Sequence, residues 1–231
     1  MTQASPLHST VPAPSGVPYN TEAAAVIKHV AHELRQPLST IESIAFFLET
    51  ILPDSEMRAR EQLAKIQILL EQASAVLGDA IYYVQAAPPR PILLDLNNLI
   101  SRIRSEEFDD CESFRLELAL PLPRIHADLH QMTHLVRALF SLMMRSTDAG
   151  APVVFRTSDA EGEVRLEISC DANLVRPMSL RAFTSSFQTH ENQAAGLACA
   201  SVQRIAEVHG GRVDIQSLDD VFSLRVAFPA A

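Results

Sequence analysis

The apolar positions of the first third of the chain repeat at intervals of three and four residues. They are Val26, Val30, Leu34, Leu38, Ile41, Ala45, Leu48 and Leu52 in a first run, and Met57, Leu63, Ile66, Leu70, Ala73, Leu77, Ile81 and Val84 in a second. This spacing places each run on one face of a long amphipathic helix. Because only a short Pro53-Asp54-Ser55 break separates the runs, the pattern predicts two antiparallel helices joined by a turn.

Such a helical hairpin has little surface of its own on which to bury two apolar faces. A second copy of the hairpin would cover them in a four-helix bundle, so we expect a homodimer. The hairpin is expected to span residues 20–86. A Ser- and Pro-rich tail over residues 1–19 is expected to be disordered, and residues 87–91 form a proline-rich linker.

Beyond the linker, short apolar runs alternate with helical patterns, which predicts a separate α/β-sandwich domain over residues 92–231 and an α+β fold for the whole chain. The expected strands are 92–94, 114–120, 153–157, 164–169, 213–216 and 222–228, and the expected helices are 96–106, 129–145 and 194–209. Glu161-Gly162 is expected to turn a hairpin, and Gly210-Gly211 to end the last helix.

The composition narrows the possible partners and compartments. There are 19 Lys and Arg residues against 28 Asp and Glu, a formal net charge of −9, and 47% of residues are hydrophobic. An acidic globular chain of this kind argues against nucleic acid as a partner. Its three cysteines have no metal-ligand spacing, and no apolar run is long enough to cross a membrane. We therefore expect a cytoplasmic protein without membrane contact.

Histidines at positions 126, 130 and 134 recur every four residues, a spacing that can bring metal ligands to one helix face. However, the helix expected from residue 129 leaves His126 outside it, and no carboxylate completes a ligand set. No metal site is predicted there, and exposed helix histidines are the simpler interpretation.

The most unusual local sequence is the heptapeptide HELRQPL, in which His32 is followed by Glu33 and, one turn later, by Pro37. A proline inside a helix removes a hydrogen bond and bends the helix, which costs stability. Glu33 can orient the imidazole or take its proton, which leaves the other ring nitrogen of His32 as a nucleophile. The alternative interpretation is an ordinary surface histidine beside a harmless kink.

Two cations accompany this histidine at helical spacing. Lys28 lies four residues before His32 and Arg35 three residues after it, so both can share its side of the helix. They can attract a phosphoryl group or an acidic partner, or simply solvate the helix surface. His29, one turn before His32, lacks a following glutamate and is expected to be only a neighbour.

The heptapeptide resembles the H-box of the dimerisation and phosphotransfer domain of bacterial two-component sensor histidine kinases. The resemblance implies that His32 accepts a phosphoryl group, that Glu33 is a general base, and that Gln36 matches the position that directs a hydrolytic water. Three later segments, over residues 94–99, 123–128 and 196–211, resemble parts of the ATP-binding domain of that family, which has the Bergerat (GHKL) fold.

The departures from this family all fall on nucleotide contacts. Ala138 and Leu142 stand where the family has two asparagines, the second of which holds Mg²⁺, and a leucine offers no oxygen to a hard cation. Cys170 stands where an aspartate reads adenine, and Asp171 comes one residue late. Gly196 is retained, with Ala194 and Ala198 in place of neighbouring glycines. The lid segment over residues 176–193 is short, with Phe183 and Phe187 as possible remnants of its aromatic motif.

The resemblance and its departures together favour a histidine phosphotransferase with a degenerate ATP-binding domain. His32 would exchange a phosphoryl group with the aspartates of response-regulator receiver domains. No intrinsic cofactor is expected, and the receiver would supply Mg²⁺. Two alternatives stay open, namely a sensor histidine kinase that phosphorylates His32 from ATP, and a pseudokinase that only binds signalling partners.

Overall fold

The computed structural model describes residues 8–9, 21–84, 88–109, 111–148, 150–175, 193–218 and 220–231. The chain divides into two compact units, one formed by Gly16–Gln85 and the other by Met1–Ser15 together with Ala86–Ala231. Among the described helices, none has both the length and the apolar character that a bilayer span requires.

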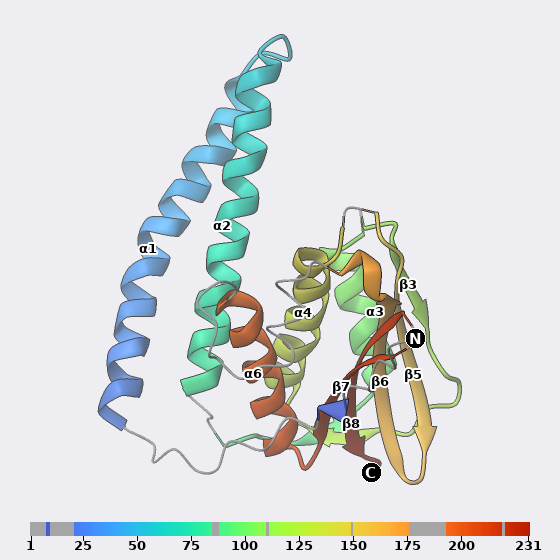
Figure 1. The fold of residues 1–231 in the computed structure, drawn as a ribbon. Coiled ribbons are helices and arrows are strands. Elements are labelled where there is room, and N and C mark those ends of the chain that lie inside the picture. Colours follow the sequence, from blue (N-terminus) through green and yellow to red (C-terminus); the bar gives the residue numbers. More distant parts are fainter. Residues whose placement is uncertain are drawn as a thin grey trace, which may run out of the picture. The chain divides into compact units, whose positions relative to one another are not determined.

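The first unit is the expected helical hairpin. Helix α1 spans Thr21–Ile51 and helix α2 spans Met57–Val84, and the two run side by side from a short turn (Figure 1). Arg60 secures the turn, because its guanidinium donates to the Leu52 carbonyl at 2.6 Å and pairs with Asp54 at 3.0 Å. The side chain of Gln67 donates to Glu49 across the hairpin at 2.8 Å.

The seam between the two helices uses only part of the apolar surface. Ala31 and Ala45 on α1 and Leu63 and Leu70 on α2 are at most 7% exposed. The two members on each helix are a multiple of seven residues apart, the period of a coiled-coil seam. Most of the apolar positions predicted to face a core on α1 are exposed in the single chain: Val26, Val30, Leu34, Ile41 and Leu48.

The second unit is built on a six-stranded sheet in the order β1-β7-β8-β6-β5-β3. Its strands are β1 (His8–Ser9), β3 (Phe114–Glu117), β5 (Val153–Ala160), β6 (Glu163–Asp171), β7 (Arg212–Leu218) and β8 (Val221–Pro229). Strands β3 and β5 pair in parallel, and the other neighbours pair antiparallel. A separate two-stranded sheet joins β2 (Ile92–Leu94) to β4 (Ile125–Ala127).

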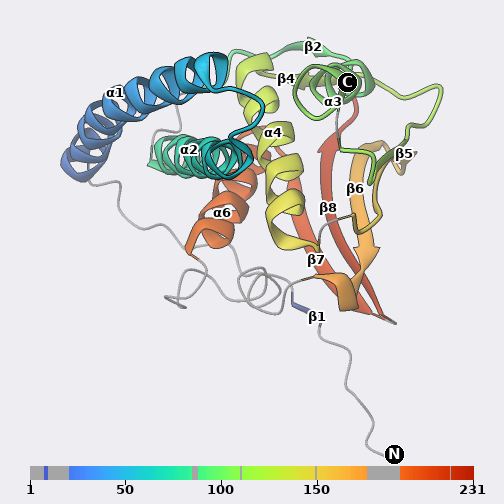
Figure 2. The ribbon, with the colours of Figure 1, turned by 90° about the horizontal axis from the view of Figure 1, so that it is seen from above.

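Three helices cover one face of the large sheet, as Figures 1 and 2 show. They are α3 (Leu96–Glu107), α4 (Leu129–Ser146) and α6 (Gln193–Val208), and a 3-10 turn, η1 (Ala172–Leu174), follows β6. The strands alternate between buried apolar residues on the helix side and polar residues on the other side. The result is a two-layer α/β sandwich, which confirms the predicted α+β class.

Aromatic side chains fill the centre of this sandwich. The ring of Phe140 on α4 stacks on Phe155 of β5 at a centroid distance of 4.1 Å and on Phe108 at 5.0 Å. Phe114 of β3 closes the cluster at 5.5 Å from both Phe140 and Phe155. Stacked and tilted aromatic rings therefore hold helix α4 against the sheet.

The solvent side of the sheet carries a row of alternating charges. The row consists of Glu117, Arg156, Glu167, Arg225 and Asp214, which are directly opposite one another on five consecutive strands. Glu117 accepts from Arg156 at 2.5 Å, and Glu167 accepts from Arg225 at 2.8 Å. Opposite charges on facing strands favour this register over one shifted by a residue.

The predicted elements agree with the structure, but several of the strands begin or end at other residues than predicted. The strand expected over 114–120 ends at Glu117, because the chain leaves the sheet and the Ala119 N–H donates to Thr157 at 3.0 Å. Strands β5 to β8 are longer than predicted. The two-residue turn at Glu161-Gly162 has positive φ at both positions and joins β5 to β6 as expected.

Two short elements were not predicted. Strand β1 lies within the segment expected to be a disordered tail, so that expectation is wrong for His8 and Ser9, and the rest of residues 1–19 lies outside the described residues. The 3-10 turn η1 begins where the Asp171 carboxylate accepts the Asn173 N–H at 2.8 Å. Residues 85–87, where the hairpin was expected to end and the linker to begin, also lie outside the described residues.

Asp128 caps the start of helix α4. The Asp128 carboxylate accepts backbone N–H groups of His130 at 2.9 Å, Gln131 at 3.0 Å and Arg90 at 2.8 Å. Burial by itself raises the pKa of this carboxyl, but the three N–H donors outweigh it and hold the pKa below the ordinary 3.8. The charged form is therefore the form that stabilises the fold.

We expect Asp128→Ala to lower the free energy of unfolding by about 1–2 kcal/mol at neutral pH, the usual value of a helix cap. Because the folded pKa lies below 3.8, this contribution is present above 3.8 and is lost as the pH falls through the folded value. Urea unfolding of both proteins near pH 7 and near pH 3 measures the difference. Asp128→Asn is the control, since it keeps an acceptor oxygen without the charge. A difference for Asp128→Ala that is independent of pH would contradict this assignment.

Candidate functional site

His32 lies in the first half of α1 with its side chain exposed to solvent, and Glu33, directly after it, is also exposed. Lys28 and Arg35 are exposed on the same helix, four residues before and three after His32. The structure shows no ion pair or hydrogen bond for these two cations among the described residues. Both charges are thus available near the imidazole.

Helix α1 continues through Pro37. The proline has no N–H to donate to the Glu33 carbonyl, so the helix lacks one hydrogen bond one turn after His32. On the far side of the proline, the Thr40 hydroxyl donates to the Gln36 carbonyl at 3.0 Å and the Ser43 hydroxyl donates to the Ser39 carbonyl at 2.9 Å. The backbone around His32 is therefore helical, but the Glu33 carbonyl lacks the N–H donor that a residue other than proline would supply at position 37.

The α/β-sandwich unit places the predicted nucleotide positions in its core. Leu142 on α4 has no exposed surface, and Ala138, one turn earlier, is 6% exposed. Side chains that held a metal or a phosphate would have to reach an accessible site. At these two positions, the side chains instead pack inside the domain and carry no ligand atoms.

Cys170 and Asp171 are the last two residues of strand β6, and they differ in exposure to solvent. Cys170 is 7% exposed and pairs across the sheet with Phe222, whereas Asp171 is exposed. Burial raises the pKa of the Cys170 thiol to about 11, and the neighbouring Asp171 carboxylate adds to the effect. The Asp171 carboxylate also accepts from the Asn173 side chain at 3.1 Å, so it serves as a cap for η1.

Helix α6 carries the retained glycine. Gly196 lies near the start of α6, and a Cβ built there meets no atom within 4 Å. Ala198, two residues later, is fully buried. A methyl group at position 198 therefore fills space in the core. The lid predicted over residues 176–193, with Phe183 and Phe187, falls almost entirely outside the described residues.

Two histidine contacts join α4 and its cap to α6 and the residue that follows it, and sequence reasoning predicted neither contact. His134 is 3.1 Å from the Ser201 hydroxyl, and the ring of His209 accepts the Asp128 N–H at 3.0 Å. The other ring nitrogen of His209 lies 2.8 Å from the Ile205 carbonyl, which accepts its proton. In the sequence, His209 gave no signal beyond its place at the end of a predicted helix.

The three histidines at four-residue spacing do not share a helix. His126 lies on β4, which ends at Ala127, whereas His130 and His134 lie on α4. Within the described part of the chain, no three His, Cys, Asp or Glu side chains are grouped closely enough to hold a metal ion.

Comparison with known proteins points to one class. No family model matches the chain. It is 24% identical over 196 residues to the sensor histidine kinase ZraS of Escherichia coli O157:H7. The aligned region covers 82% of this chain and 42% of ZraS. The chain thus spans less than half the length of this relative.

Solved structures show the same class of fold. Full-length ShkA, solved in complex with AMPPNP, has a TM-score of 0.63 at 22% identity, covering 90% of this chain and 46% of ShkA. The catalytic domain of histidine kinase ThkA has a TM-score of 0.52 at 18% identity, covering 61% of this chain and 96% of that domain. In sequence the chain is similar to sensor histidine kinases, and its α+β fold matches that of histidine kinase structures.

We expect Cys170 to react far more slowly than Cys111 with iodoacetamide at pH 8. Cys170 is buried with a pKa of about 11, so roughly 0.1% of it is thiolate at that pH, whereas Cys111 is partly exposed. Peptide mass spectrometry over time should show a rate difference of about tenfold or more. In urea the two rates should converge. Equal rates in the folded protein would mean that the end of β6 is open.

Proposed function

We propose that this chain acts in two-component signalling as a histidine phosphotransferase, which moves a phosphoryl group between His32 and receiver-domain aspartates without using ATP. The observation that carries the proposal is the contrast between an exposed His32 and a fully buried Leu142. The phosphoacceptor position is accessible, whereas the position that holds Mg²⁺ in the family it resembles has become part of the core. Similarity to sensor histidine kinases supports the signalling context.

The transfer itself needs few groups from this chain. A ring nitrogen of neutral His32 attacks the phosphorus of the receiver's aspartyl phosphate, and an N–P bond forms as the P–O bond to the aspartate breaks. The carboxylate leaves with the electron pair, and Glu33 can accept the proton of the other ring nitrogen. Transfer to a second receiver runs the same step backwards. Mg²⁺ would come from the receiver.

The cations beside His32 suit this chemistry. Lys28 and Arg35 share its side of α1, so they can lower the energy of the charge that develops on the transferring phosphoryl oxygens. Gln36 stands at the position of the resembled family from which a water is directed, so a slow hydrolysis of phospho-His32 is a further activity to test.

Loss of nucleotide binding is part of the proposal. Mg²⁺ requires oxygen ligands in octahedral geometry, which Ala138 and Leu142 do not provide. The buried Cys170 thiol has a raised pKa and cannot replace a carboxylate that accepts from the adenine amino group. Gly196 alone does not make a phosphate cradle, which needs several backbone N–H groups in one concavity.

Two other functions fit the same similarity. A sensor histidine kinase that phosphorylates His32 from ATP is favoured by the names of the relatives in sequence. A pseudokinase that only binds signalling partners needs no His32 chemistry at all. The three functions differ in the source of phosphate and in their dependence on His32.

We expect purified protein to take radiolabel from a phosphorylated receiver domain and not from Mg·ATP. His32→Gln should lower the label by about a hundredfold or more, because it removes the nucleophile. His29→Gln is the matched control, since His29 is exposed one turn away on α1, and it should keep nearly full labelling.

Each other outcome of this assay selects a different function. Label from Mg·ATP that His32→Gln abolishes would establish a kinase and contradict the proposed loss of nucleotide binding. No label from either source, with several phosphorylated receivers tried, would favour the pseudokinase.

We further propose that the hairpin dimerises into a four-helix bundle. On α1, Ile41 is 45% exposed, Ile44 52% and Ile51 56%, although all three are large and apolar. Their spacing places them along one side of the helix. A contiguous apolar stripe of this kind on a described surface is typical of an interface.

We expect light scattering at micromolar concentration to give twice the mass of one chain. The double change Ile41→Glu and Ile44→Glu should shift the protein to monomers, because each buried carboxylate weakens the interface by about tenfold or more. Ser39→Glu is the control, since it adds the same charge at an exposed polar position of α1 and should leave the dimer intact. A monomeric wild-type protein would refute the bundle.

A further inference from the structure

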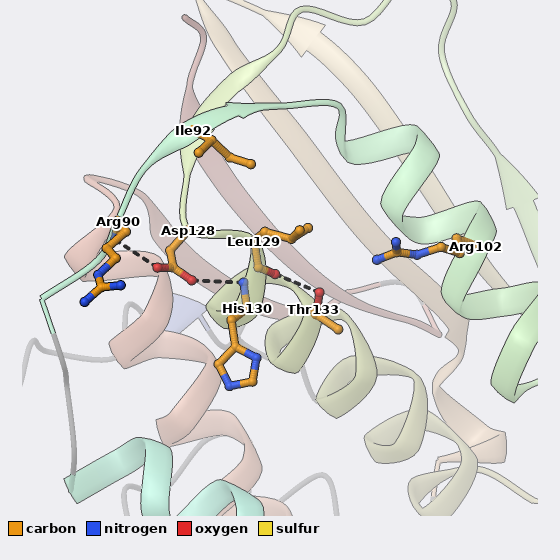
Figure 3. Close-up of a pocket in the computed structure, with 7 residues that line it drawn as sticks. All are labelled: Arg90, Ile92, Arg102, Asp128, Leu129, His130 and Thr133. Carbon is orange, nitrogen blue, oxygen red and sulfur yellow. Dashed lines mark hydrogen bonds between the residues drawn. The ribbon is translucent and has the colours of Figure 1, made fainter.

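A surface cavity of about 390 Å³ lies at the start of α4, within the α/β-sandwich unit. Figure 3 shows Arg90 and Arg102 on opposite sides of it, with Ile92 and Leu129 between them. Arg90 precedes β2, Arg102 comes from α3, and Leu129 is the first residue of α4. This cavity, called the arginine cleft below, thus combines three separate elements in one surface site.

The two arginines of the cleft differ from six other arginines of the same unit. Six others pair with a carboxylate: Arg104, Arg137, Arg156, Arg165, Arg212 and Arg225. Within the described residues, the structure shows no ion pair or hydrogen bond for the guanidinium of Arg90 or Arg102, and both side chains are exposed. In an acidic chain of net charge −9, two such cations on one cavity are unusual.

The carboxylate at the cleft is already engaged. Asp128 accepts three backbone N–H groups, and one of these belongs to Arg90 itself. These bonds hold its pKa low, so it stays charged, but they direct its oxygens into the helix cap. The two guanidinium groups therefore keep their donors for a ligand.

The cleft is lined by two apolar side chains that are partly exposed to solvent. Ile92 is 50% exposed and Leu129 is 41% exposed, and both line the cavity. Leu93, next on β2, is also 50% exposed. A free inorganic anion would leave these side chains in water. A ligand that uses the whole cleft needs an apolar group beside its negative charges.

We propose that the arginine cleft binds an acidic peptide segment of another protein, in which carboxylate side chains flank an apolar one. Each carboxylate accepts two parallel hydrogen bonds from a guanidinium, and the apolar side chain covers Ile92 and Leu129. A lipid surface fits less well, because recognition of anionic membranes takes clusters of about four to eight basic residues, and the cleft has two arginines. The site is independent of the function proposed for His32.

The test is fluorescence polarisation with a fluorescein-labelled peptide of sequence Asp-Leu-Glu-Leu-Asp-Leu and the whole chain of 231 residues. We expect saturable binding that weakens as salt is added, since exposed charges are screened. Arg90→Ala and Arg102→Ala should each weaken binding about tenfold. Arg90→Ala leaves the backbone N–H on Asp128, so the cap is retained.

Arg115→Ala is the matched control, because Arg115 is exposed on β3 and the structure likewise shows no ion pair for it among the described residues. It should change binding less than about twofold. An uncharged peptide, Asn-Leu-Gln-Leu-Asn-Leu, should bind at least about tenfold more weakly than the acidic one.

Three results would overturn the proposal. The first is no binding of the acidic peptide by the wild-type chain, and the second is binding that both arginine variants leave unchanged. The third is inorganic phosphate that binds more tightly than the peptide, which would assign the cleft to a free anion. Thermal unfolding of each variant shows that a loss of binding is not a loss of fold.

Discussion

The burial of α4 against the sheet is the constraint on which the α/β-sandwich unit depends. Phe140 stacks between Phe108 and Phe155, and Leu139 and Leu142 beside it have no exposed surface. Close-packed interiors tolerate few voids, so each residue that faces the sheet from α4 must fill space. The Asp128 cap fixes the start of the same helix, and the Asp128 N–H donates to His209, which directly follows α6.

This constraint bears on the proposed loss of the nucleotide site. In the resembled family, asparagines stand at the positions of Ala138 and Leu142, and the second of them holds Mg²⁺. Here Leu142 contributes to the core instead, and Ala198 does the same on α6. Full burial of a leucine side chain stabilises a fold by about 1.5–3 kcal/mol. Substitutions that remove ligand atoms can thus be favourable for stability, which accords with the proposal that the domain no longer binds ATP.

The helical hairpin obeys a different constraint. Its internal seam buries two alanines and two leucines, and several larger apolar residues of α1 are exposed. A single hairpin of two helices offers no further surface to cover them. The proposed phosphotransfer site therefore lies on an element whose own stability argues for a partner, whereas the described part of the sandwich unit buries an apolar core of its own.

The sequence by itself determined the two helices of the hairpin, the order of the other strands and helices apart from β1 and η1, and the α+β class, because periodicity is a local property. It also placed His32 on the first helix and Leu142 on the helix that became α4. It did not determine the length of β3, the pairing of His8 and Ser9 with β7, or the bond between His209 and Asp128, since these depend on residues far apart in the chain. The arginine cleft is of the same kind. Arg90, Arg102 and Leu129 are separated by up to 39 positions, and only packing of β2, α3 and α4 brings them to one surface. Tertiary structure decided these features because side chains meet there only after the backbone has closed around a common core.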